Sequence, residues 1–280
     1  RIIMKFSKNI LWISFFAILI FILVLYIYYE VNCPTFKKIE VKSNKIKNDI
    51  RILQISDYHN KKFKNENRAV LDEVKNLKSD IIVITGDLIN RSSENCDNAY
   101  NFIKELIKIN PNVYFINGNH ERDNINIPAD ELDLNLSKLG VRVLINQGLK
   151  VNINGNYINI CGVDDIYSHN CDLSKALYDT ESNLFTLLLS HEPDIVLKYS
   201  SIPCDLILSG HTHGGQIRLP LIGAIIAPGQ GFFPKYNKGL YKLSNDTTLY
   251  VDSGLGTAKF FPIRFLNRSQ MSLIKISQSL

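Results

Sequence analysis

The sequence predicts an α/β protein with two packed, mixed β-sheets flanked by helices, preceded by one transmembrane helix. Three observations predict this: an uncharged apolar run, an alternation of apolar strands with amphipathic helices, and more strands than one sheet would hold. The expected order is a basic N-terminal segment (1–9), the transmembrane helix (10–29), a linker (30–48) and a globular domain (49–280).

Composition sets few limits on function. Hydrophobic residues make up 45% of the 280 residues and charged residues 21%, which is ordinary for a globular protein. The net charge of +5 is modest and gives no indication of a nucleic-acid partner. The five cysteines are scattered without a Cys-x-x-Cys pair, which argues against a disulfide framework.

Residues 10–29 are uncharged and apolar. At about 1.5 Å per residue, a helix of this length crosses the roughly 30 Å hydrocarbon core of a bilayer. Trp12 and a tyrosine cluster near residue 28 lie at its two ends, where interfacial aromatics occur. A cleaved signal peptide is disfavoured because the run is too long and no small-x-small site follows it.

The orientation of the helix is nearly balanced, because three basic residues precede it and three follow it closely. A short basic N-terminus more often stays in the cytoplasm, so we expect the globular domain outside the cytoplasm, at the cell membrane. Residues 30–48 are polar and lysine-rich without apolar periodicity, which predicts a linker. The six basic residues are Arg1, Lys5, Lys8, Lys37, Lys38 and Lys42.

Strands and helices alternate in the first half of the domain. Apolar strands are predicted at 51–56, 80–85 and 113–116, and amphipathic helices at 65–78 and 96–109. Further along, a helix is expected at 128–139 and a hairpin with its turn at Asn154-Gly155. More short strands are predicted at 184–189, 205–208, 249–253 and 271–276.

Polar side chains collect just after five of these strands, where open α/β sheets bind their ligands. Five of the six histidines lie at such ends, which random placement would not produce. Taken singly, each has an ordinary explanation as a turn, a cap or a buried core residue. The strand-end residues are Asp57, His59, Asp87, Asn119, His120, His191, His211 and His213.

These side chains offer the oxygen and nitrogen donors that suit Mn, Fe, Zn or Co. Two cations about 3.5–4 Å apart can stabilise both the attacking and the leaving oxygen of a phosphoryl displacement. Such ions repel each other, so an anionic ligand between them is needed, and an aspartate is suitable. We therefore expect two divalent metal ions, with Mn favoured.

The series Asp-x-His, Gly-Asp, Gly-Asn-His-Glu, His and Gly-His-Thr-His resembles the calcineurin-like metallophosphoesterase superfamily from about residue 50 to the C-terminus. The resemblance implies the four-layer αββα fold of that family. The stretches 214–220, 233–234 and 253–256 resemble its membrane-anchored bacterial branch, some members of which resemble lipid-linked UDP-sugar pyrophosphohydrolases.

The resemblance also implies roles for the strand-end residues. Asp87 would bridge the two ions, and His120 would contact the phosphoryl oxygens or protonate the leaving oxygen instead of binding metal. Glu121 is expected to anchor its turn, and Arg122 either reaches the substrate phosphate or lies on the surface. Asp57, His59 and His213 would hold the first metal, and Asn119, His191 and His211 the second.

The expected function is a two-metal-dependent phosphoesterase that hydrolyses a phosphodiester or pyrophosphate bond with a metal-bridging hydroxide, on a lipid- or envelope-linked substrate. A phosphomonoesterase, a protein phosphatase and a non-catalytic metal-site scaffold are the alternatives. The expected partners are this phosphate ester and the membrane, with no nucleic acid, and the chain is expected to be a monomer. The apolar stretch 219–227, with Phe232 and Phe233 after it, is either a core-packing loop or an apolar lip facing a membrane or an acyl chain.

Overall fold

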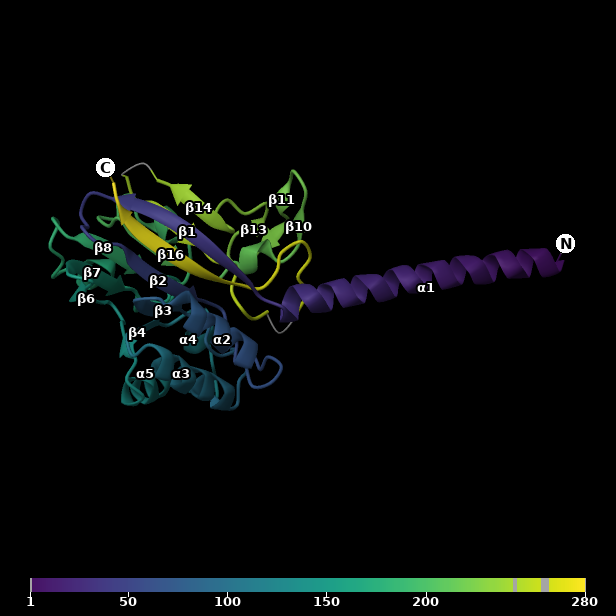
Figure 1. The fold of residues 1–280 in the computed structure, drawn as a ribbon, viewed down its shortest axis with the longest axis horizontal. Coiled ribbons are helices and arrows are strands. Elements are labelled where there is room, and N and C mark those ends of the chain that lie inside the picture. Colours follow the sequence, from purple (N-terminus) through teal and green to yellow (C-terminus); the bar gives the residue numbers. More distant parts are fainter. Residues whose placement is uncertain (1, 244–245, 258–261, 280) are drawn as a thin grey trace.

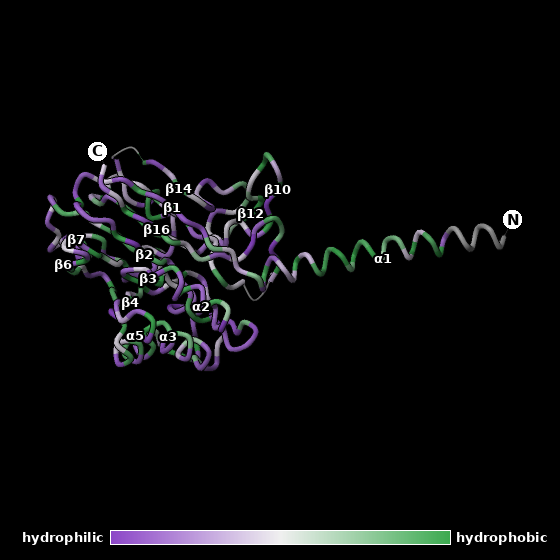
Figure 2. The backbone as a smooth tube through the Cα atoms, viewed as in Figure 1, coloured by the Kyte–Doolittle hydropathy of each residue, from purple (hydrophilic) through white to green (hydrophobic). Residues whose placement is uncertain are grey.

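The computed structural model describes the backbone of residues 2–243, 246–257 and 262–279, and side chains from residue 9 onward. One long helix, α1 (Ile2–Asn32), projects from a two-sheet domain (Figure 1). Within Asn9–Asn32 the apolar window has a mean hydropathy of 3.0 and none of it is buried, so this helix is long and apolar enough to cross a membrane. Most of its described length is hydrophobic in Figure 2.

The first sheet has six strands in the order β1-β16-β2-β3-β4-β5. Strands β2 to β5 run parallel, and β16 is antiparallel to β2 but parallel to β1. Their bounds are β1 (Thr35–Ser43), β2 (Ile50–Ile55), β3 (Ile81–Thr85), β4 (Val113–Ile116), β5 (Arg142–Val143) and β16 (Gln270–Gln278).

The second sheet also has six strands, in the order β14-β15-β9-β8-β7-β6. Its four central strands are parallel and both edge strands are antiparallel to their neighbours. The predicted hairpin at Asn154-Gly155 is confirmed, since it joins β6 to β7. The bounds are β6 (Gln147–Ile153), β7 (Asn156–Gly162), β8 (Phe185–Leu189), β9 (Leu206–Ser209), β14 (Gly239–Lys242) and β15 (Thr248–Val251).

The two sheets pack face to face through buried aliphatic side chains such as Ile52, Val83 and Leu208. The outer face of the first sheet packs against helices α2 (Arg68–Leu77), α3 (Asp97–Ile109) and α5 (Ala129–Lys138), which confirms the three predicted helices. The short helices α6 (Leu173–Ala176) and α7 (Ile195–Lys198) pack on the second sheet. The predicted architecture of two mixed sheets flanked by helices is therefore confirmed.

The prediction of a linker at 30–48 is wrong for most of that segment. Helix α1 continues to Asn32, and β1 pairs along its whole length with β16. Within β1 only Val41 is buried, because the strand lies at the edge of the sheet and its lysines face solvent. An edge strand of this kind has a polar sequence with little apolar periodicity, so the sequence alone does not indicate a strand here.

The apolar stretch after the His-x-His pair forms two small hairpins. Ala224 and Ala227 are buried, whereas Leu221 and Ile222 are exposed, so the stretch is partly core and partly an apolar surface. The chain reaches these hairpins through the single turn η1 (His213–Gly215). The strands are β10 (Arg218–Leu219), β11 (Gly223–Ala224), β12 (Ile226–Ala227) and β13 (Gly231–Phe232).

Candidate metal centre

The structure brings all eight strand-end residues together where the two sheets meet. The loops after β2 and β3 and helix α4 (Asn119–Arg122) after β4 come from the first sheet. The loops after β8 and β9 come from the second. Because the contributing strands are parallel within each sheet, their carboxyl ends lie at one edge, and packing of the sheets joins the two edges.

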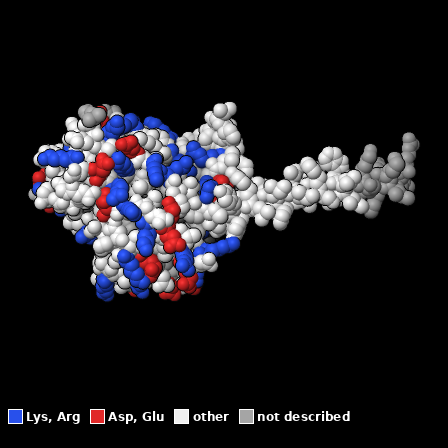
Figure 3. Space-filling view, viewed as in Figure 1, with Lys and Arg blue, Asp and Glu red and all other residues white. Residues whose placement is uncertain are grey.

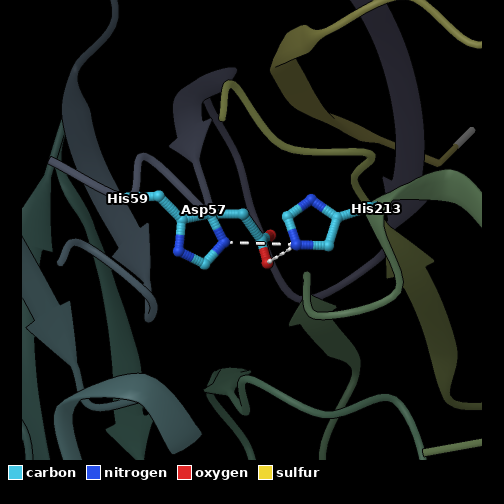
Figure 4. Close-up of side chains that lie close together, drawn as sticks. All are labelled: Asp57, His59 and His213. Atoms are coloured by element: carbon cyan, nitrogen blue, oxygen red, sulfur yellow. Dashed lines mark hydrogen bonds and ion pairs between the residues drawn. The ribbon is translucent and has the colours of Figure 1, made fainter. Parts of the chain in front are cut away.

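One group of side chains consists of Asp57, His59 and His213 (Figure 4). The Nε2 atoms of His59 and His213 are 3.2 Å apart, and Asp57 Oδ1 lies 3.7 Å from His213 Nε2. All three residues are buried. Three donor atoms therefore face one point inside the protein.

A second group lies beside the first and contains His191, His211 and Asn119. His211 Nδ1 is 3.2 Å from His191 Nε2 and 3.0 Å from Asn119 Oδ1. The two imidazole rings meet edge to face. This group thus presents two nitrogens and one amide oxygen to a second point.

The carboxylate of Asp87 lies between the two groups. Its Oδ2 is 3.2 Å from His191 Nε2 in the second group and 3.8 Å from His59 Nε2 in the first. Its Oδ1 accepts a hydrogen bond from the backbone N–H of His120. The carboxylate is thereby held in one orientation, with Oδ2 facing both groups.

Hydrogen bonds distinguish two kinds of histidine at this site. His191 Nδ1 lies 2.7 Å from the Thr85 carbonyl oxygen, which can only accept, so Nδ1 carries a proton, and in the neutral imidazole Nε2 has a free lone pair. His120 has the opposite arrangement, because its Nδ1 accepts from the backbone N–H of Arg91. In the neutral imidazole of His120, the proton is therefore on Nε2, which lies 3.8 Å from Asp87 Oδ2.

Burial governs the protonation of the other histidines. It lowers the pKa of His59 to about 3 against the opposing effect of Asp87, and it lowers the pKa of His211 to about 3 together with the nearby His191. Both imidazoles are therefore neutral near pH 7, as metal ligation requires. Burial also lowers the pKa of His213 well below its ordinary value.

His191 and Asp57 behave differently. Burial alone would lower the pKa of His191, but the adjacent Asp87 carboxylate outweighs it and raises that pKa well above its ordinary value. Burial raises the pKa of Asp57 to about 7. A cation bound between these groups would compete with the proton on His191 and stabilise the ionised form of Asp57.

The donor set fits divalent cations. Two nitrogens that share one ion at about 2.1 Å lie about 3.2 Å apart when the angle at the ion is about 100°. Both histidine pairs have this spacing, 3.2 Å between His59 and His213 and 3.2 Å between His191 and His211. Four imidazoles, two carboxylates and one amide suit borderline metals better than Mg²⁺ or Ca²⁺.

The loops that carry these side chains have an unusual backbone. Gly86, before Asp87, has φ +85°, and a Cβ there would lie 2.6 Å from His191 Nδ1, so only glycine fits. Five of the site residues adopt a left-handed conformation that side chains other than glycine rarely take. Their φ values are 51° for Asp57, 55° for His59, 52° for Asp87, 67° for His211 and 48° for His213.

Three neighbouring residues complete the surroundings of the site. Glu121 accepts hydrogen bonds from the backbone N–H groups of Asp87, Ile89 and Gly118, which confirms that it anchors the turn. The Arg122 guanidinium is paired with Asp164 at 2.7 Å and with Asp130 at 3.4 Å, so it is held by carboxylates of the protein. Tyr58 stacks on Phe102 in the helical layer, away from Asp57 and His59.

Sequence reasoning missed the role of Arg264, which is completely buried. Its guanidinium donates to the carbonyl oxygens of Ser253 and Gly256 at 2.6 and 2.7 Å, and Nη2 lies 3.4 Å from His213 Nδ1. The loop that it holds hydrogen-bonds to the backbone of Asp57. Arg264 lies among aromatic residues in the sequence, and arginine is usually a surface residue. The sequence therefore gives no indication of this buried role.

Comparison with known proteins agrees with this geometry. The model of the calcineurin-like phosphoesterase family matches residues 50–215. The metallophosphoesterase YkuE of Bacillus subtilis is 32% identical over 233 residues, which cover 82% of this chain and 79% of YkuE. The phosphodiesterase YaeI of Escherichia coli is 28% identical over 200 residues, covering 71% of each chain.

A solved structure shares the fold at low sequence identity. The protein TT1561 of Thermus thermophilus has a TM-score of 0.50 and 11% identity, and the alignment covers 74% of this chain and 91% of TT1561. The family match includes every strand-end motif from Asp57 to His213. This chain therefore belongs to the calcineurin-like phosphoesterase family and is a metal-dependent phosphoesterase.

Proposed function

We propose that this chain hydrolyses a phosphodiester or pyrophosphate bond at a centre of two divalent ions, with Mn favoured. The position of Asp87 Oδ2, which faces His191 at 3.2 Å and His59 at 3.8 Å, carries the proposal. A carboxylate in this position offsets the repulsion between two neighbouring cations. When bound, such ions lower the pKa of water and neutralise phosphoryl oxygens.

The geometry supports one division of the ligands. Asp57, His59 and His213 bind the first ion, and Asn119, His191 and His211 bind the second. Asp87 contributes to both. The interatomic distances within each group, 3.0 to 3.8 Å, support this division.

His120 acts on the substrate and does not bind metal. Arg91 holds its Nδ1 as an acceptor, so Nε2–H is available to donate to a phosphoryl oxygen or to the leaving oxygen. Its imidazole also contacts the ring of His59 edge to face, which places it at the rim of the first ligand group. About one fifth of this side chain is exposed, so substrate can reach it.

The substrate is a phosphate ester linked to a lipid or to the cell envelope. A helix that can span a membrane precedes the domain, and the relative YaeI bears the name phosphodiesterase. The domain lies on the extracytoplasmic side. Labelling intact cells with a membrane-impermeant thiol reagent, at a cysteine introduced for Tyr178 in an otherwise cysteine-free chain, tests this, and absence of labelling would place the domain inside.

Hydrolysis assays distinguish the bond types. With Mn²⁺ added, the full chain should hydrolyse bis-p-nitrophenyl phosphate faster than p-nitrophenyl phosphate. A preference for the monoester would instead support a phosphomonoesterase. A turnover assay on a bacterial lipid extract, read by mass spectrometry, would then identify the lipid class, and an extract left unchanged would refute the lipid-linked substrate.

A further inference from the structure

We propose that the two hairpins β10–β11 and β12–β13 dock into the surface of the bilayer that α1 spans. The residues that would enter the bilayer, here called the apolar tips, are Leu221, Ile222, Phe232 and Phe233. This inference rests on the proposed membrane anchorage, and it adds a second contact between the domain and the membrane. It also orients the metal centre relative to the lipid surface.

The apolar tips are far more exposed than apolar side chains normally are. Leu221 is fully exposed, and the exposed fractions of Ile222, Phe232 and Phe233 are 60%, 73% and 67%. Single exposed apolar residues are common, but four in one small element indicate a contact surface. The segment 219–233 contains no charged residue, and Arg218 and Lys235 lie just outside it.

The two hairpins form one unit. The backbone N–H of Ile225 donates to the Ile217 carbonyl, and that of Phe233 donates to the Ile225 carbonyl. These bonds tie the start of the first hairpin to the end of the second. Both sets of apolar tips therefore belong to a single small platform with fixed backbone geometry.

The platform is joined to the membrane helix. Arg218 N–H donates to the Phe265 carbonyl at 3.0 Å, and the Phe265 ring packs edge to face on Tyr26 of α1, with ring centroids 5.6 Å apart. Tyr26 lies in the tyrosine cluster where interfacial aromatics are expected. In Figure 1, β10, β11 and β13 project at the edge of the domain from which α1 leaves.

The base of α1 is hydrogen-bonded to the domain, which keeps the platform on the side from which α1 leaves. Lys61 Nζ donates to the Val31 carbonyl at 2.6 Å, and Arg268 Nε donates to the Cys33 carbonyl at 2.7 Å. Glu30 is buried and its carboxylate accepts from the Asn267 backbone. A membrane therefore meets α1 and the platform at the same side of the molecule.

The chemistry of the platform selects a lipid surface as its partner. Figure 3 shows that the projecting end of the hairpins carries no charged side chain, whereas the domain surface beside it is covered with both signs of charge. Interfacial amphipathic helices bury their apolar face about 5–10 Å into the headgroup and acyl boundary, and the exposed apolar tips are suited to the same region. The platform is linked to α1 through Phe265, and this favours the bilayer over a second copy of the chain.

The opposite end of the platform contacts the metal centre. Gly229, in the turn between β12 and β13, lies so close to His211 that a Cβ there would be 3.2 Å from Nε2. A platform that joins the lipid surface to a residue of the metal centre would position that centre for a phosphate held at the bilayer surface. Docking would therefore support the proposed action on a membrane-linked ester, because it would place the metal centre at the bilayer surface.

Site-directed spin labelling tests the docking without using catalysis. The full chain, with the exposed and half-buried cysteines Cys33, Cys171 and Cys204 replaced by serine, carries a nitroxide at Leu221→Cys or Phe232→Cys and is reconstituted in phosphatidylcholine–phosphatidylglycerol liposomes. The matched control is Tyr157→Cys, on β7 at the edge of the domain far from α1 in Figure 1 and 55% exposed. Collision of each label with oxygen, which enters bilayers, is compared with collision with a water-soluble nickel chelate.

We expect oxygen to dominate at positions 221 and 232 and the nickel chelate to dominate at 157. Equal access of the chelate to all three positions would overturn the docking. Dipolar broadening at 221 that disappears when unlabelled chain is added would also overturn it, because it would place a second copy on the platform. Flotation of the chain with the liposomes reports the anchorage by α1 separately, and loss of hydrolysis alone would refute only the proposed function.

Discussion

At the scale of single residues, the site depends on conformations that the chain adopts only under constraint. A left-handed backbone at a residue other than glycine costs on the order of 1–3 kcal/mol. Asp57 and His59 hold this conformation because their N–H groups donate to the carbonyls of Gly86 and Asp87, at 3.1 and 2.9 Å. The loops after β2 and β3 thus stabilise each other and direct their side chains to one point.

Asp87→Asn should reduce turnover by orders of magnitude and weaken metal binding. The amide keeps the shape of the side chain but removes the negative charge that faces both ligand groups. Hydrolysis of bis-p-nitrophenyl phosphate across a Mn²⁺ titration measures both effects. The control is Asp123→Asn, a half-exposed carboxylate paired with Arg91. Wild-type hydrolysis by Asp87→Asn would contradict the assignment.

His120→Ala and His191→Ala should fail in different ways. Loss of a proton donor costs about 10²–10⁴-fold in turnover, so His120→Ala should be slow yet retain its metal. His191→Ala should lose both activity and metal, because its Nε2 faces the second group. Elemental analysis beside kinetics separates the two outcomes. Equal metal loss in both variants would make His120 a ligand.

At the scale of elements, the metal centre depends on segments that lie behind its ligands. The loop at 253–256 is held by Arg264 and supports the loop after β2, because the backbone N–H groups of Leu255 and Gly256 donate to the carbonyls of Ser56 and Asp57. Burying an arginine is costly unless its donors are used, and here they satisfy carbonyl oxygens. The guanidinium therefore acts as a structural cation beneath the first ligand group.

Arg264→Met should destabilise the fold by about 3 kcal/mol, because buried carbonyl oxygens lose their donor at roughly 1–3 kcal/mol each. The midpoint of thermal unfolding, measured on the full chain in detergent, should fall well below that of the parent. Arg142→Met is the control, since Arg142 is exposed and packs on Tyr114. An unchanged midpoint for Arg264→Met would show that the carbonyls find other donors.

Individual elements differ in how well the sequence predicts them. Buried strands such as β3 and β8 are predominantly apolar runs, and α3 has a clear apolar stripe, so their positions could be predicted. Strand β1 could not, because an edge strand is polar. The side chains that meet at the site could be predicted from strand ends, but the role of Arg264 and the left-handed loops could not, because they depend on contacts between distant segments.

At the scale of the whole molecule, the metal centre joins the two sheets. Asp57, Asp87 and Asn119 come from the first sheet, and His191, His211 and His213 come from the second. Cations held between them cross-link the two layers at one edge of their interface. Metal binding should therefore stabilise the packing of the sheets as well as support the chemistry.

Chelation should lower the thermal midpoint of the full chain, and Mn²⁺ should restore it. A ligand that binds only the folded state stabilises it by about 2.7 kcal/mol at a concentration one hundred times its Kd. In Asp87→Asn the shift should be much smaller, since one shared ligand is lost. Differential scanning calorimetry with and without chelator measures this, and identical shifts in both chains would refute a cross-link through Asp87.

The central claim is that Asp87 bridges two ions held by the two histidine groups. Electron paramagnetic resonance of the Mn²⁺-loaded chain tests it most directly, because two bridged Mn²⁺ ions are magnetically coupled. We predict the spectrum of a coupled pair for the parent chain and the loss of coupling in Asp87→Asn. A spectrum of isolated Mn²⁺ ions from the fully loaded parent chain would contradict the account.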